Sequence, residues 1–179
     1  EEFVIIKKRV LSFLLSFCML ISVISIDAVV SAAEPTNVAA NPSGAADGTT
    51  ISSNYTWKYA ENNGLGLKRM NNGNTGDWGA TNPNEVTYID LTFQQAYLVS
   101  QIRLRSMSDG RFPKDFTISV WTENGWKEVA RETDYPTPTD NVWVEYSFHS
   151  VACRAVRLNV TEKGCDSGGD YLIGLREID

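Results

Sequence analysis

Short stretches that alternate between apolar and polar residues, separated by turn residues, run from Ile51 to the last residue of the chain. Residues 116–121 (FTISVW) alternate cleanly, and in 99–105 (VSQIRLR) Ile102 and Leu104 alternate with two arginines. The apolar residues of this part of the chain do not follow the 3.6-residue period of a helix over a helix's length. A period of two predicts strands with one buried and one exposed face, so we expect an all-β fold, an antiparallel β-sandwich or jelly roll.

Seven or eight such strands are expected, and the connections between them differ in length. A Glu-Asn-Gly turn at 123–125 predicts one hairpin, because Asn-Gly readily adopts positive φ. The other expected strands are 86–91, 126–130, 142–148, 155–160 and 171–178.

If successive strands run in opposite directions, alternate connections lie at the same end of the sandwich. One end then collects short connections, and the other collects long ones that carry Gly, Asn, Asp, Arg and aromatic residues. Long loops at one end of a rigid scaffold are typical of a binding face, although long loops can also be tolerated insertions. The short connections are 92–97, 122–125 and 149–153, and the long ones are 61–85, 106–115, 132–141 and 161–170.

Residues 7–33 have the order of a secretory signal peptide: a basic start, an apolar run and a small-residue segment. A transmembrane anchor is the alternative, but the apolar run of about 17 residues is at the short limit for spanning a bilayer. We expect a signal peptide and leader at 1–33, a linker or edge segment at 34–50, and the β-sandwich domain at 51–179. The protein is therefore predicted to be secreted, and to be extracellular or on the cell surface.

The composition fits one domain with a substantial core and argues against several kinds of partner. The chain has 179 residues, of which 42% are hydrophobic, and its formal net charge is -6. The predicted domain has no cluster of Lys and Arg of the kind that binds nucleic acid or an anionic membrane. We therefore expect the protein to bind neither nucleic acid nor an anionic membrane. We also expect it to be a monomer.

Two cysteines and the single histidine argue against a catalytic site. Cys153 and Cys165 flank the predicted strand 155–160, and a strand of this length holds them roughly 20 Å or more apart, which is too far for a disulfide. We expect two free thiols, with Cys153 a small core residue. His149 falls in a short connection away from the long loops, where it cannot serve a Ser-His-Asp or Cys-His site.

A set of short stretches also occurs across residues 38–179 in a recognisable order and spacing. The stretches are 52–55 (SSNY), 72–78 (NGNTGDW), 88–91 (YIDL), 102–105 (IRLR), 112–118 (FPKDFTI), 155–160 (AVRLNV) and 175–178 (LREI). Together they resemble the discoidin-like, coagulation factor V/VIII C-type domains, and among these the bacterial family 32 carbohydrate-binding modules. The resemblance implies a galactose-binding-domain-like jelly roll that is not catalytic and that tethers a larger secreted bacterial glycoside hydrolase to glycans.

The resemblance further implies a structural calcium ion beneath the binding loops. Loops rich in Gly and Asn, with one or two carboxylates, suit Ca²⁺, which takes about six to eight oxygen ligands. Asn72 stands where the family commonly has Asp, and fewer charged ligands would weaken binding. The alternative is an Asn/Gly turn without metal. The candidate ligands are Arg69 through its carbonyl, Asn72, Asn74, Asp77 and Glu177.

The sugar site is expected among the long loops, because sugars are bound by aromatic rings together with planar polar groups. Arg111 with Phe112 is the leading pair, since an arginine fork contacts two vicinal oxygens and Phe112 would stack beside it. The alternative is a solvated Arg111 and a Phe112 that plugs the edge of the sandwich. Galactose-binding members commonly use a His, which His149 cannot supply, so the sugar is left open. The remaining candidates are Trp78, Asn63, Asn82, Asp170 and Tyr171.

Three functions compete at this point. A carbohydrate-binding module is the leading hypothesis. A discoidin-type adhesion or protein-interaction module would instead show a broad apolar patch at the loop tips. A glycosidase would need two carboxylates, such as Asp109 and Asp170, about 5–5.5 Å apart for retention or about 6.5–9.5 Å apart for inversion.

Overall fold

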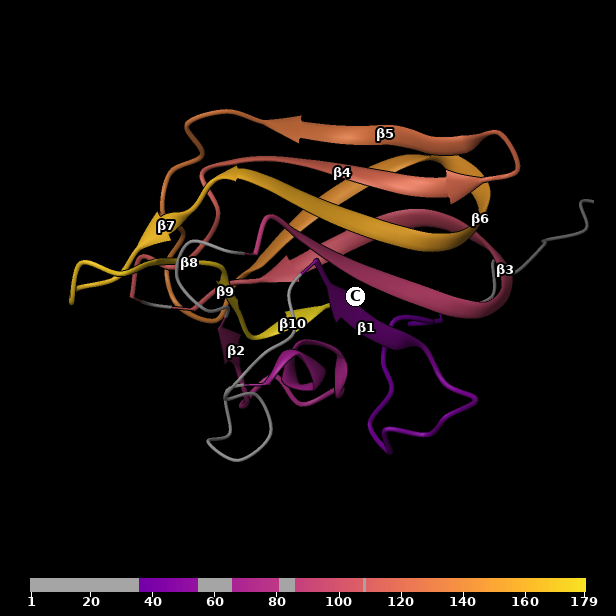
Figure 1. Ribbon diagram of the computed structural model, residues 1–179, viewed down its shortest axis with the longest axis horizontal. Coiled ribbons are helices and arrows are strands. Elements are labelled where there is room, and N and C mark those ends of the chain that lie inside the picture. The colour runs from indigo at the N-terminus through magenta and orange to yellow at the C-terminus, as the bar shows by residue number, and fades with distance from the viewer. Residues whose placement is uncertain (1–35, 55–65, 81–85, 108) are drawn as a thin grey trace, which may run out of the picture. The chain divides into compact units, whose positions relative to one another are not determined.

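Two long antiparallel strands, β3 (Tyr88–Arg105) and β6 (Trp143–Glu162), form the centre of the domain (Figure 1). Their pairing has two irregularities, the first between Thr92 and Tyr97 of β3. Both strands curve strongly at these points, as strands do at bulges. Each strand therefore contributes one half to each of two layers.

The computed structural model describes residues 36–54, 66–80, 86–107 and 109–179. Thr36–Asp179 forms one compact unit. The predicted signal peptide at 1–33 lies outside the described residues. Within the described ranges, no helix has the length and apolar character needed to cross a membrane.

The first layer has the strand order β1–β3–β6–β4–β5 and uses the first half of β3 with the second half of β6. The other halves of β3 and β6 form the second layer, where the short strand β10 pairs with the end of β3. Every pairing in both layers is antiparallel among the described strands. The added strands are β1 (Thr50–Ser53), β4 (Asp115–Thr122), β5 (Gly125–Glu132) and β10 (Glu177–Ile178).

Apolar side chains of the two layers face each other and form the core. In β4 every second residue is buried, namely Phe116, Ile118 and Val120. Ile102 and Leu104 of the second layer line the same apolar interior as Ile118 of the first. Each such side chain contributes about 1.5–3 kcal/mol when it is fully buried, so the period-two pattern drives the association of the layers. The predicted antiparallel β-sandwich is confirmed.

The number of separate strands differs from the expectation. The predicted strands 86–91 and 99–105 are both parts of β3, and 142–148 and 155–160 are both parts of β6. The register shifts let the chain turn round the edge of the sandwich while its backbone stays in the ladder. Residues 92–97 are accordingly a bend within a strand and not a loop.

Short elements complete the domain beside the loops. The expected strand 171–178 is broken into three pieces, each with a different partner, because the chain crosses from the loop end back to the second layer. Asn37 Nδ2 donates to Asp179 Oδ1 at 2.7 Å, so the segment before β1 packs on the same unit. These elements are the 3-10 helix η1 (Leu67–Asn71), β2 (Gly79–Ala80) paired with β9 (Gly174–Leu175), and β7 (Gly164–Cys165) paired with β8 (Tyr171–Leu172).

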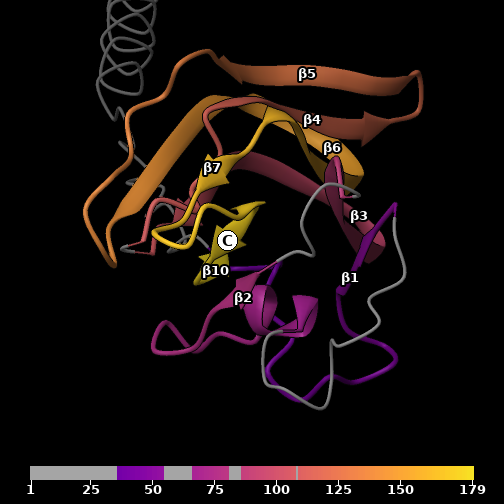
Figure 2. The ribbon, with the colours of Figure 1, turned by 60° about the vertical axis from the view of Figure 1, so that its left-hand side comes forward.

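The long connections gather at one end of the sandwich. The bends of β3 and β6 and the β4–β5 turn lie on the right of Figure 1, and the long connections lie on its left. Backbone and side-chain hydrogen bonds join the loops: Tyr135 N donates to Lys114 O at 3.0 Å, and Ser106 Oγ to Thr139 O at 2.6 Å. Figure 2 shows the same separation from another side. The described connections at this end are 106–107, 109–114, 133–142 and 163–170.

Candidate functional site

Arg111 lies in the connection between β3 and β4 and is held by two carboxylates. Its Nε lies 2.8 Å from Asp109 Oδ2, and its Nη2 donates to Asp166 Oδ2 at 3.1 Å. The guanidinium carbon lies 5.2 Å from the ring centroid of Trp78, within cation–π range. We call these four residues the Arg111 cluster. Nη1 has no hydrogen bond or ion pair with a described residue, and the side chain as a whole is 20% exposed.

Asp166 is fixed by its own loop before it meets the arginine. Its Oδ1 accepts hydrogen bonds from Gly168 N at 2.8 Å and Asp170 N at 3.0 Å. The hydrogen bond from Asp170 N lowers the pKa of the Asp166 carboxyl most, and Gly168 N and the Arg111 guanidinium add to the effect. Asp166 is therefore held as an anion that positions Arg111.

Glycines let the loops approach closely enough to build this cluster. Gly110 has φ +83°, and a side chain there would collide with the carbonyl oxygen of Cys165. At Gly174 a Cβ would lie 2.7 Å from the Cβ of Arg111 and 2.8 Å from Met107 Sδ. Only glycine tolerates such contacts and the positive φ without strain.

Phe112 does not occupy the position expected of a stacking residue. Its ring is 1% exposed and packs against Phe116 and Tyr135, with centroids 6.0 and 5.5 Å away. The expectation that Phe112 stacks on a sugar is wrong, because a ring enclosed in the core has no face for a ligand. The alternative stated for Phe112, that it plugs the edge of the sandwich, is the one that its burial supports.

The other predicted sugar-binding residues fall into three groups. Tyr171 is 55% exposed and Asp170 is exposed, so both present their side chains at the loop end. Trp78 is half-buried and packs on Arg111, so it both anchors its loop and borders the cluster. Asn63 and Asn82 lie outside the described residues.

The candidate calcium ligands lie together in the loop that follows η1. Asp77 is bound on both sides: Arg69 Nη1 lies 2.9 Å from its Oδ1, and Asn72 Nδ2 donates to its Oδ2 at 3.0 Å. Asn74 caps the turn by accepting from Gly76 N at 3.0 Å. The structure therefore brings the loop residues of the predicted set into one neighbourhood.

Glu177 joins this loop from β10 and is buried. Its Oε1 accepts a hydrogen bond from Gly73 N at 2.9 Å, whereas Oε2 is buried without a partner among the described residues. Burial, with a smaller contribution from the nearby Asp179 and Asp77 carboxylates, raises the pKa of Glu177 to about 7, although the hydrogen bond from Gly73 N acts in the opposite direction. A buried carboxylate oxygen without a partner is costly, and a cation would satisfy it. The unpartnered Oε2 would suit a calcium ion, whereas Asp77 is already paired with Arg69.

Any cation here would need further oxygens in addition to the Glu177 carboxylate. Within the described part of the chain, no group of three or more His, Cys, Asp or Glu side chains is placed to hold a metal ion. Carbonyl and amide oxygens of the 69–77 loop would have to complete the shell, as Ca²⁺ accepts and transition metals seldom do.

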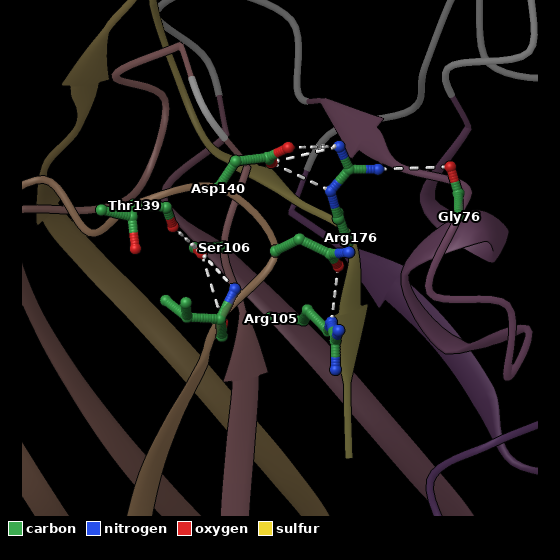
Figure 3. Close-up of polar contacts among 8 residues, drawn as sticks. Gly76, Arg105, Ser106, Thr139, Asp140 and Arg176 are labelled. Carbon is green, nitrogen blue, oxygen red and sulfur yellow. Dashed lines mark hydrogen bonds and ion pairs between the residues drawn. The ribbon is translucent and has the colours of Figure 1, made fainter.

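Arg176 ties this loop to another part of the loop end (Figure 3). Its Nη1 donates to Gly76 O at 3.2 Å, and its Nη2 donates to both carboxylate oxygens of Asp140 at 3.1 and 3.0 Å. Ser106 fixes the same loop by donating to Thr139 O. The sequence pattern did not single out Arg176, because its partners are 36 and 100 residues away in the chain.

The two cysteines are free thiols, as predicted, whereas the expected connection 149–153 with His149 is part of strand β6. Cys153 is buried and Cys165 is partly exposed, and both are free thiols in the described structure. Burial raises the pKa of the Cys153 thiol to about 11, so it stays protonated. His149 is exposed within β6, at the irregularity between Ser147 and Val151, which both pair with β3.

The chain matches the family model of the F5/8 type C domain over residues 47–176. No curated protein matches it. It is similar in structure to chitosan-binding module 1 of a chitosanase/glucanase from Paenibacillus sp. IK-5, at 19% identity and TM-score 0.57, over 80% of this chain and 97% of that one.

Two further solved structures are similar to the chain. Chitosan-binding module 2 of the same Paenibacillus enzyme, in complex with chitotriose, has 18% identity and TM-score 0.57, over 80% of this chain and 98% of that one. The family 32 carbohydrate-binding module of C. perfringens NanJ, in complex with galactose, has 14% identity and TM-score 0.57, over 73% of this chain and 90% of that one. The fold and the family model agree over most of the described residues, and the chain belongs to the F5/8 type C domain family.

Proposed function

We propose that this domain binds carbohydrate without transforming it, and that it tethers a larger secreted glycoside hydrolase to glycans. The observation that carries the proposal is the Arg111 cluster: a guanidinium fixed by Asp109 and Asp166, bordered by Trp78, at the loop end of a rigid sandwich. The structurally similar modules that bind chitosan or galactose support the ligand class. The secretion predicted from residues 7–33 supports an extracellular role.

The cluster has the chemistry that a sugar requires. The two carboxylates hold the guanidinium in one orientation, which lowers the entropy lost on binding. The Nη1 edge would donate hydrogen bonds to ring hydroxyls, and the exposed Tyr171 would supply an aromatic face. This arrangement fits a small part of a glycan, such as a terminal sugar.

We further propose a structural calcium ion at the loop of residues 69–77, with the buried Glu177 as its main charged ligand. When bound, the ion would neutralise the Glu177 carboxylate. Glu177 and Asp77 would then fix the loop that carries Trp78, which borders Arg111.

The carboxylates of the cluster argue against the glycosidase alternative. That alternative pairs Asp109 with Asp170, and Asp109 Oδ2 lies 2.8 Å from Arg111 Nε, so this carboxylate is already engaged in an ion pair. A chromogenic glycoside assay on the purified chain is expected to show no turnover, and turnover lost on Asp109→Asn would establish the enzyme instead.

A glycan array followed by affinity gel electrophoresis tests the main proposal. The wild-type chain should be retained by at least one glycan, and Tyr171→Ala should weaken that retention. His149→Ala is the matched control, because it removes an exposed ring that lies within β6 and outside the Arg111 cluster. No retention on any glycan, with binding to cell-surface proteins instead, would favour a discoidin-type adhesion module.

A further inference from the structure

Two tryptophans lie exposed on the outer face of the first layer, away from the loop end. Trp121 of β4 is 43% exposed and Trp126 of β5 is 38% exposed. They are opposite each other in the register, with ring centroids 5.3 Å apart at 69°. Trp121 follows the buried Val120, so alternation places its ring on the face that points away from the core.

Arg157 extends this aromatic surface across the sheet. Its guanidinium carbon lies 4.4 Å from the ring centroid of Trp126 and 3.8 Å from that of Tyr88. Asp90 holds it in place with two hydrogen bonds of 2.7 Å from Nε and Nη2. Tyr88, Arg157, Trp126 and Trp121 therefore form one continuous surface over four strands, which we call the sheet-face strip.

Two arginines at the strip are each paired with a carboxylate. Arg157 is paired with Asp90, and Arg131 is paired with Glu128 at 2.6 Å. Beside them, Ser119 lies in register with Arg157, and Asn159 lies in register with both Tyr88 and Thr117. A surface of ring faces, hydroxyls and an amide, whose arginines are paired in this way, suits a neutral polyhydroxylated ligand.

Hairpin stability alone does not account for this arrangement. A cross-strand tryptophan pair stabilises a hairpin, but that role does not require Trp126 to join an arginine stack that reaches Tyr88 on β3, three strands away from β5. Large exposed apolar surfaces on soluble domains usually mark binding sites.

We propose that the sheet-face strip is a second carbohydrate-binding surface, which takes the internal part of a neutral polysaccharide chain. It lies on an open strand face, where a chain can pass at both sides, whereas the Arg111 cluster lies among loops. The inference rests on the proposed function for its ligand class, but it concerns a different surface. Together the two surfaces would grip one polymer at separate points, which raises its avidity.

Affinity electrophoresis of the full chain in gels that contain xyloglucan, galactomannan or β-1,3-glucan tests the strip. Trp121→Ala/Trp126→Ala should weaken retention by roughly three- to tenfold, and Trp121→Phe should keep most of it, because a ring remains. Leu98→Ala is the matched control, since Leu98 is 75% exposed on the curved part of β3 and lies outside the strip. Melting temperatures of all variants are measured, and Trp121→Ala alone serves if the double variant does not fold.

The outcomes separate this inference from the function on which it rests. Trp121→Ala and the double variant could be retained as strongly as wild type while Tyr171→Ala is retained more weakly. That result would overturn the proposal that the sheet-face strip binds polysaccharide, and it would leave the proposed function standing. Failure of all three polysaccharides and of the glycan array to retain the wild-type chain would overturn both. A wild-type dimer in sedimentation velocity that becomes monomeric in Trp121→Ala would assign the strip to self-association and overturn the inference.

Discussion

Glu177 Oε1 accepts a hydrogen bond from Gly73 N across 104 residues of sequence, while Oε2 of the same carboxylate is buried without a described partner. This relationship attaches the 69–77 loop to the last strand of the domain. It also leaves a negative charge in the interior with only half of its usual hydrogen bonds. The buried Glu177 charge therefore destabilises the contact between the loop and the strand, and binding of a cation or a proton would remove that cost.

Removal of the Glu177 charge is expected to stabilise the metal-free domain above neutral pH. The folded pKa of about 7 lies above the ordinary 4.5, so the unfolded chain ionises first and stability falls as pH rises from 4.5 to about 7. Glu177→Gln keeps the acceptor for Gly73 N and should recover up to ~3 kcal/mol at pH 8 in chelator, and almost nothing at pH 4. Urea unfolding at both pH values measures this difference.

Calcium is expected to stabilise the wild-type chain more than Glu177→Gln, which is the opposite of the order expected in chelator. It should raise the melting temperature of the wild-type chain more at pH 8 than at pH 5, because protons compete for the same carboxylate. Glu177→Gln should lose most of the shift. A calcium effect of the same size in both proteins, or none in wild type, would remove Glu177 from any metal site.

Substitution of Arg111 is expected to affect stability as well as glycan binding. Arg111→Ala leaves the Asp109 and Asp166 carboxylates facing each other without a cation, at a cost of about 1–3 kcal/mol. Arg111→Lys restores a charge without the fork, so it should recover stability more than binding. Thermal unfolding and affinity electrophoresis of the two variants measure these effects separately. Equal stability of Arg111→Ala and wild type would contradict the view that Arg111 holds the Asp109 and Asp166 carboxylates together.

Phe112 and Tyr171 are expected to behave in opposite ways. Phe112→Ala removes a core ring and should lower stability by ~3–5 kcal/mol, with glycan affinity kept in the folded fraction. Tyr171→Ala should leave stability within about 0.5 kcal/mol and weaken binding. Chemical unfolding and calorimetry with the best array glycan distinguish them, and a strong binding loss in folded Phe112→Ala would restore it to the site.

Arg176→Ala is expected to loosen two loops at once. Its guanidinium is the link between Gly76 O and Asp140 in the described structure, so backbone amides of 72–77 and 133–142 should exchange hydrogen faster. The loss in global stability should be near 1 kcal/mol, since Asp140 is 41% exposed. Hydrogen exchange read by mass spectrometry measures both loops, and faster exchange confined to one of them would contradict the link.

The two thiols should differ in reactivity. Cys153 is buried and its pKa is raised to about 11, so it is protonated and shielded at pH 8. Cys165 is partly exposed beside Gly110. Peptide mapping after a short iodoacetamide pulse should find Cys165 labelled well before Cys153, and the reverse order would show that β6 opens locally.

Much of the fold could be predicted from local pattern. The clean alternation of 116–121 placed Phe116, Ile118 and Val120 on the buried face, and the Asn-Gly turn set the hairpin in which Thr122 pairs with Gly125. These features depend on neighbours in sequence, so a single chain reveals them. The continuity of β3 was missed, because the polar and aromatic residues at its bend resemble a connection more than a strand.

The site was less predictable because it depends on contacts between distant segments. Phe112 lies just before Pro113 and outside any alternating run, so its burial follows only from packing against Tyr135. The partners of Arg111 are separated by 57 residues, Asp109 on one side and Asp166 on the other. Likewise, Trp121 and Trp126 were visible as strand residues, but their link to Arg157 required the order of β6, β4 and β5.

The curved pairing of β3 with β6 has a consequence for how the domain fails. Because β3 and β6 each supply hydrogen bonds to both halves of the sandwich, neither half can separate without breaking strands that the other half also uses. Neither heat nor a pulling force should unfold one half while the other stays folded, so we expect a single cooperative unfolding transition. A protein anchored to a stiff polymer would then hold firmly up to one threshold and release in a single step.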